Sequence, residues 1–139
     1  DLDSTWEGME GARQAADLFP DLQFILGNCG MPMERSSEYH RNWMAGLERL
    51  ASVPNVAVKI SGLGMTDHEW TTTSIRPWVL GLIETFGVDR CMFASNWPVD
   101  SLYSSYRAVF DAYKEITVDF SASEQAALFW QNAERYYRI

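Results

Sequence analysis

The fold is decided by the stretch NVAVKISGLG at residues 55–64. Its apolar run, at 56–60, is rich in β-branched side chains, which predicts a buried strand. Similar runs, LQFIL at 22–26 and CMFAS at 91–95, predict two more strands. Each run leads into small or polar residues, and these endings are Ser61-Gly62-Leu63-Gly64, Gly27-Asn28-Cys29-Gly30 and Ser95-Asn96-Trp97-Pro98.

Segments with helical spacing separate these strands. They cover residues 6–18, 36–52, 75–86 and 103–115, and a last helix begins at Ser121, where Glu124 completes a capping box. Helices that alternate with strands predict an α/β fold with a parallel sheet of βαβ units, in one domain over residues 1–139. Ligands bind at the carboxyl ends of such strands, so the three polar endings predict a shaped site.

Composition excludes several function classes. The 139 residues carry 11 Lys and Arg against 19 Asp and Glu, a net charge of 11 − 19 = −8, which opposes binding to nucleic acid or to an anionic membrane. No apolar run approaches the ~20 residues of a transmembrane helix, and the acidic start is not a signal peptide. Two cysteines cannot make a disulfide framework, so a reducing cytoplasm is the expected compartment.

Four ordered motifs resemble the carboxyl-terminal half of the amidohydrolase-related hydrolases, and they are LGNCGMP, NVAVKISGLGMTDHEW, RPWVLGLIETFGVDRCMFASNWPVDSLY and ALFWQNAERYYRI. This family includes fuconolactonase, 2-pyrone-4,6-dicarboxylate lactonase and several non-oxidative decarboxylases. The resemblance implies the last three strands and the trailing helices of a (β/α)₈ barrel. A complete barrel takes about 250 residues, so the expected architecture is an incomplete barrel and a fragment of a longer protein. Its open edges and uncovered inner face predict self-association or pairing with a missing N-terminal half.

The resemblance also implies a change at two metal-related positions. Family members often bind a divalent metal such as zinc, using an Asp after the last strand and a His after the third-last strand. Aligned on Trp97 and Pro98, the Asp position holds Asn96, and aligned on Gly30 and Pro32, the His position holds Asn28. An amide is a poor metal ligand and cannot act as a base at pH 7, so no metal or other cofactor is expected in this chain.

The remaining side chains predict a site for a small-molecule substrate. The expected catalytic residues are Asn96, which like Asn28 can donate to an oxyanion, and His68 or Asp100 as the base. The expected substrate-binding residues are Asn28, Ser61, Trp70 and Trp97. Structural roles stay open beside these: both asparagines as turn residues, His68 as a solvated loop residue and Asp100 as a helix cap.

Three functions follow from the resemblance. The first is a hydrolase of a lactone or another small cyclic carbonyl compound, active within a complete barrel. The second is a non-catalytic remnant that at most binds a ligand, and the third, which Asn96 opposes, is a decarboxylase-type lyase. Lys59, inside the strand run, either pairs with an acid between barrel and helices or faces substrate in the barrel interior.

Overall fold

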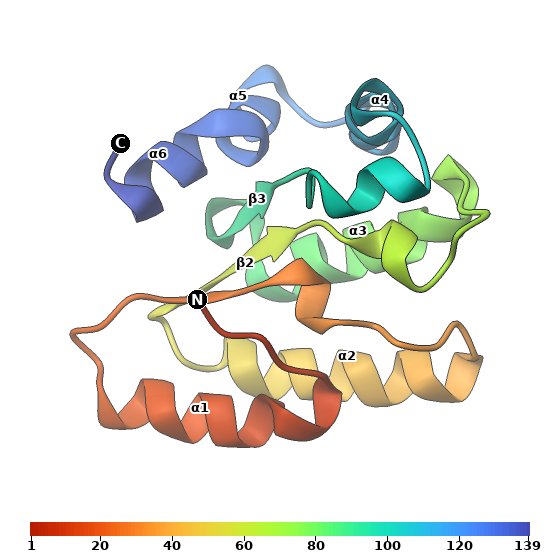
Figure 1. Cartoon of the computed structure of the whole chain (residues 1–139). Coiled ribbons are helices and arrows are strands. Elements are labelled where there is room, and N and C mark those ends of the chain that lie inside the picture. Colours follow the sequence, from red (N-terminus) through yellow and green to blue (C-terminus); the bar gives the residue numbers. More distant parts are fainter.

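A computed structural model describes residues 1–139 as a parallel sheet with helices (Figure 1). The three strands lie in the order β1-β2-β3, and all neighbours run parallel, as predicted. The strands are β1 (Phe24–Leu26), β2 (Val56–Ile60) and β3 (Cys91–Phe93). The helices are α1 (Met9–Leu18), α2 (Ser37–Ala51), α3 (Thr72–Phe86), α4 (Tyr106–Ile116), α5 (Ala122–Ala126) and α6 (Asn132–Tyr137).

Local sequence explains where the helices begin. Ser36 caps α2 by accepting from the backbone N–H of Tyr39, and Thr71 caps α3 in a reciprocal capping box with Ser74. The predicted box of Ser121 and Glu124 is present at α5. From there the chain stays helical to Tyr137, with one π-helical stretch, Ala127–Gln131, between α5 and α6.

The sheet extends by one residue beyond β1. Leu2 forms a parallel bridge to Leu26, with hydrogen bonds from Leu2 N to Ile25 O and from Gly27 N to Leu2 O. The outer edge of β1 is therefore partly paired, and Leu2 lies where a fourth parallel strand would pair.

Most of the core lies on one face of the sheet. Successive helices α1 to α4 pack against their neighbours in the chain, and α2 and α3 cover the face of β2 that carries Val56, Val58 and Ile60, all fully buried (Figure 1). Alternation along the strand places Ala57 and Lys59 on the opposite face. This arrangement makes the carboxyl ends of the strands one common rim.

The expectation of an uncovered inner face is wrong at its centre. Ile25, Ala57 and Met92 form a small second cluster there and are all at least 95% buried, because Ala133 and Tyr136 of α6 pack against them. Lys59 shares this face with Ala57 and pairs with an acid, since its Nζ lies 2.7 Å from an Asp1 carboxylate oxygen. Lys59 therefore pairs with an acid, as the first alternative predicted, but it lies on the inner face of the sheet, as the second alternative predicted.

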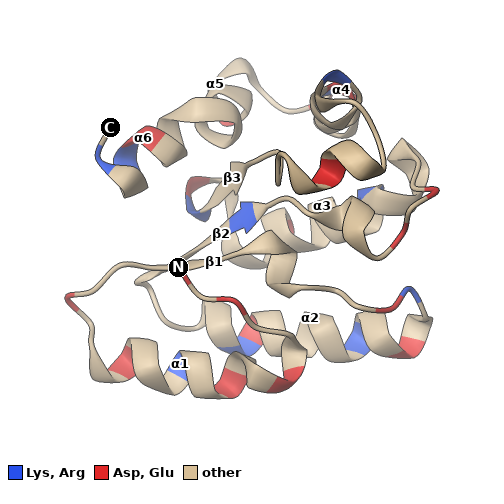
Figure 2. Cartoon of the chain, viewed as in Figure 1, with Lys and Arg blue, Asp and Glu red and all other residues tan.

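Acidic residues outnumber basic ones along the chain, in line with its net charge of −8. Acidic side chains are spread over the helices and loops, and basic ones are interspersed with them (Figure 2). None of the helices has both the length and the apolar character that crossing a membrane requires.

Candidate functional site

The first group of predicted residues lies after β1 and β2. Asn28 follows β1 and Ser61 follows β2, and the Ser61 hydroxyl donates to Asn28 Oδ1 at 2.9 Å. Ser61 is 2% exposed, whereas Asn28 is partly exposed. The Asn28 amide nitrogen makes no hydrogen bond within the chain, which leaves a donor at the carboxyl end of the sheet.

An unusual turn aims Asn28. Four successive residues, Asn28 to Met31, have positive φ angles between 45° and 66°. Side chains with a Cβ rarely adopt this region, so neighbouring contacts must hold the turn in place. The indole N–H of the buried Trp43 donates to Cys29 O at 2.8 Å, and the Cys29 thiol donates to Ser61 O at 3.2 Å. The turn is thereby tied both to α2 and to the end of β2.

The second group lies after β3. Asn96 has a φ of 55°, and its amide nitrogen donates to an Asp100 carboxylate oxygen at 2.9 Å. Asp100 is only 3% exposed, and this desolvation raises the pKa of its carboxyl, while the hydrogen bond from Asn96 opposes the rise. A carboxylate held in this way is a stronger base than a surface aspartate.

The third group joins two loops at the same rim. His68 lies in the loop between β2 and α3, and its ring stacks on Tyr103 at 4.2 Å between centroids and 7° between planes. A His68 ring nitrogen lies 3.2 Å from Met65 O. Trp70 and Tyr103 both pack close to Gly64, because a Cβ built on that glycine would lie 3.3 Å from Trp70 and 3.5 Å from Tyr103.

The seven predicted residues thus fall into three local groups and one outlier. No hydrogen bond joins one group to another. Trp97, the outlier, is 43% exposed and contacts Tyr106 of α4 edge-on, at 5.7 Å between centroids. Its role in substrate binding stays a prediction, as do the roles of the other six.

Sequence reasoning did not single out Tyr103 or Arg35. Tyr103 was expected only as the start of a helix, yet α4 begins three residues later, and Tyr103 lies in the loop beside His68. Arg35 links the loops after β1 and β2, since its guanidinium donates to Leu63 O at 2.7 Å and to Pro32 O at 3.4 Å. The sequence around Arg35, a polar loop ahead of a helix cap, does not indicate that its side chain bridges two loops.

The residues present do not make a zinc site. No group of three or more His, Cys, Asp or Glu side chains lies close enough together to hold a metal ion. Near the strand ends the carboxylate of Asp100 stands beside the amide of Asn96, and amides are poor zinc ligands.

Comparison with known proteins identifies relatives of this chain. It is 50% identical over 139 residues to the uncharacterized protein y4mH of Sinorhizobium fredii, covering all of this chain and 46% of that protein. It is 31% identical over 127 residues to an L-fucono-1,5-lactonase of Burkholderia multivorans, covering 83% of this chain and 43% of the lactonase.

A solved structure extends the comparison. A zinc-bound amidohydrolase of Burkholderia multivorans superposes with a TM-score of 0.90 at 26% identity, over 97% of this chain and 50% of that one. The chain thus spans about half the length of these relatives. The family model described as amidohydrolase matches residues 3–139, almost the whole sequence. The chain belongs to the amidohydrolase 2 family and is related to the L-fucono-1,5-lactonases.

Proposed function

We propose that this chain carries part of the active site of a lactone hydrolase. The observation that supports this most is the pair of Asn96 and the buried Asp100 at the end of β3, in a chain 31% identical to an L-fucono-1,5-lactonase. The pair combines a desolvated carboxylate with an amide that fixes its orientation. The substrate class is a small cyclic ester, such as a sugar lactone.

The chemistry needs a base and an oxyanion donor. Asp100 takes a proton from a water molecule as the water oxygen bonds to the lactone carbonyl carbon. The free amide nitrogen of Asn28 donates to the oxyanion that forms, while Ser61 holds the Asn28 oxygen. The ring C–O bond then breaks, and the proton on Asp100 passes to the departing ring oxygen. The product is an open-chain hydroxy acid, one water heavier than the lactone.

His68 has a secondary place in this proposal. It is exposed and stacked on Tyr103, so it forms part of the rim around a bound substrate. Together with Trp70 it offers an aromatic wall to an uncharged ring. Asp100, rather than His68, is the proposed base because only Asp100 is both buried and held by a second candidate residue.

We also propose that the site is completed by further strands of a (β/α)₈ barrel. The chain spans about half of its relatives, and Leu2 already forms a parallel bridge to β1. In this proposal the three strands are the last three of the barrel. Native mass by light scattering tests it: a natural protein close to 139 residues long that stays monomeric would refute the proposal, whereas a longer chain or a stable self-assembly would support it.

The test of activity uses the natural full-length protein and L-fucono-1,5-lactone, followed by acid release. We expect Asp100→Asn to lower kcat by about 10²-fold or more, the range of a lost general base. The matched control is Asp111→Asn, because Asp111 lies on the surface of α4 in an ion pair with Arg107. Binding of lactone with no turnover in the unmodified protein would instead favour the non-catalytic remnant. The amides at positions 28 and 96, which replace the family's His and Asp, are consistent with that alternative.

A further inference from the structure

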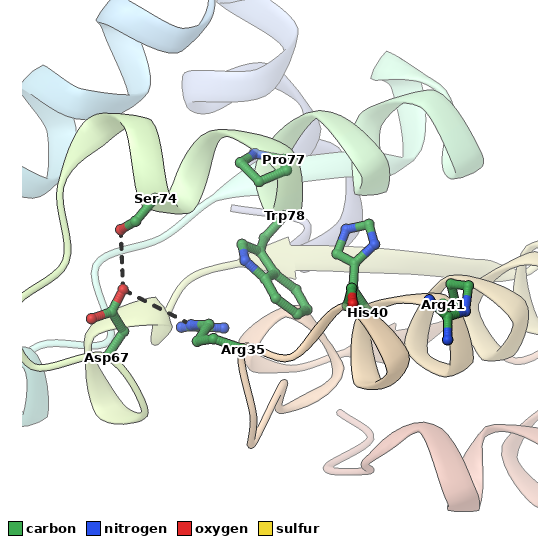
Figure 3. Close-up of a pocket in the computed structure, with 8 residues that line it drawn as sticks. Arg35, His40, Arg41, Asp67, Ser74, Pro77 and Trp78 are labelled. Carbon is green, nitrogen blue, oxygen red and sulfur yellow. Dashed lines mark hydrogen bonds and ion pairs between the residues drawn. The ribbon is translucent and has the colours of Figure 1, made fainter.

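A cavity of about 520 Å³ is lined by residues of α2 and α3 and of the loops that precede these helices (Figure 3). Six of the eight residues that line it carry polar or charged side chains, and the other two are Pro77 and Trp78. Ser37, His40 and Arg41 come from α2, and Ser74 comes from α3. Its size falls in the range of small-molecule pockets, and its lining combines charged and polar groups with the apolar surfaces of Pro77 and Trp78.

The charge of the cavity is opposite to that of the protein. Arg35 and Arg41 face it against one carboxylate, Asp67, which gives 2 − 1 = +1 with His40 neutral, in a chain of net charge −8. A concave site with walls of the minority sign concentrates ions of the opposite sign. The expected guest is therefore an anion.

Arg35 has no close carboxylate partner within the chain, although its guanidinium donates to two backbone carbonyls. Its Nε lies 4.0 Å from the nearest Asp67 oxygen, beyond hydrogen-bond distance, and that oxygen accepts instead from the Ser74 hydroxyl at 3.0 Å (Figure 3). The side chain is 22% exposed, and burial lowers its pKa, which the Asp67 charge opposes. A largely buried guanidinium that is paired this loosely favours an additional anion nearby.

Two buried nitrogens at this wall have no hydrogen-bond partner, Arg35 Nε and His40 Nε2. Both side chains pack on Trp78, with the Arg35 guanidinium 4.8 Å and the His40 ring 4.7 Å from it. Unpaired buried polar atoms are rare in folded proteins, and here both belong to residues that line one cavity.

We propose that this cavity binds a small molecule bearing a carboxylate or phosphate group, and that the bound anion fixes the loops after β1 and β2. Arg41 and Ser37 hold the anion from α2, and Arg35 holds it from the loop. Arg35 is the link to the catalytic rim, because it donates to Pro32 O and Leu63 O, one in each loop. Asp67, which shares the cavity, directly precedes His68.

The direct test is calorimetric titration of the natural full-length protein with inorganic phosphate and with succinate, at constant ionic strength. We expect Arg41→Gln to weaken the binding of one or both by about tenfold, since it removes a charge-assisted contact. Arg107→Gln is the matched control, because Arg107 is 90% exposed on α4 and is not one of the residues that line the cavity. Tighter binding of phosphate would indicate a guest with a phosphate group, and tighter binding of succinate would indicate a guest with a carboxylate group.

Hydrogen exchange locates the effect. Bound anion should slow amide exchange in residues 27–36 and 61–71 and leave α4 unchanged. No binding of either anion at millimolar concentration would overturn the proposal, as would equal binding by the unmodified protein and by both Arg41→Gln and His40→Gln. These outcomes do not depend on lactone hydrolysis, so the proposal can stand or fall without the proposed activity.

Discussion

Replacing Tyr113 by phenylalanine should loosen the rim that carries the candidate site. Tyr113 is 2% exposed on α4, and its hydroxyl lies 3.2 Å from Ile60 O and 3.4 Å from Ala94 O, at the ends of β2 and β3. Its ring stacks on Phe93 at 4.3 Å between centroids, so a phenylalanine ring keeps the same packing. The substitution therefore isolates the contribution of one hydroxyl.

The magnitude follows from the fate of the two carbonyls. Ile60 O still accepts from Ala94 N at 3.0 Å, so it keeps a partner, whereas Ala94 O loses the only donor it has within the chain. One buried hydrogen bond is worth about 1 kcal/mol, and an acceptor left without a partner costs about 1–3 kcal/mol. Because the bond to Ala94 is long, we expect a loss of about 1–2 kcal/mol in the free energy of unfolding.

Urea unfolding of the natural full-length protein, followed by circular dichroism, measures this loss. The midpoint should fall with no change in slope, because the surface exposed on unfolding is unchanged. Tyr106→Phe is the control, since Tyr106 is 52% exposed and its hydroxyl makes no hydrogen bond within the chain. A loss below about 0.5 kcal/mol, or one equal to that of the control, would refute the reasoning.

Three further predictions concern charge and reactivity. Asp100→Asn should raise the free energy of unfolding near pH 7, because the raised pKa of Asp100 means that its charged form destabilises the fold. This gain over the unmodified protein should vanish at acidic pH, where Asp100 becomes neutral. Urea unfolding at several pH values measures both effects. Asn28→His combined with Asn96→Asp should create zinc affinity, measured as bound zinc per chain, and an unchanged zinc content would contradict the assignment of these positions. Burial raises the pKa of Cys29 to about 12 and raises that of Cys91 as well, so both thiols should resist a disulfide reagent at pH 8 until the protein is unfolded, and rapid labelling of the folded protein would contradict their burial.

The strands could be predicted because parallel strands that are buried on both faces appear in the sequence as continuous apolar runs. The run at 56–60 matches β2 residue for residue. The start of α3 was expected at residue 75 and lies at Thr72, because its capping box is made by Thr71 and Ser74, without the acidic residue that usually marks such a start.

The site was less accessible to sequence reasoning. Hydrophobic periodicity carries no information on contacts between loops, so the stacking of His68 on Tyr103 and the bridge made by Arg35 were not predicted. The pairing of Asn96 with Asp100 depends on a backbone conformation with positive φ at Asn96, which one sequence does not specify. The burial of the second sheet face was missed because it depends on where α6 packs.

The left-handed turn at residues 28–31 has a consequence for the mutational tolerance of the chain. Cys29 and Met31 each carry a Cβ in a backbone region that costs about 1–2 kcal/mol per residue, or about 2–4 kcal/mol together, whereas Asn28 adopts this region at a lower cost. That sum is a large part of the stability of an ordinary domain. A screen for thermostable variants should therefore return glycine at position 31, where the side chain is partly exposed, and should reject valine and isoleucine throughout the turn.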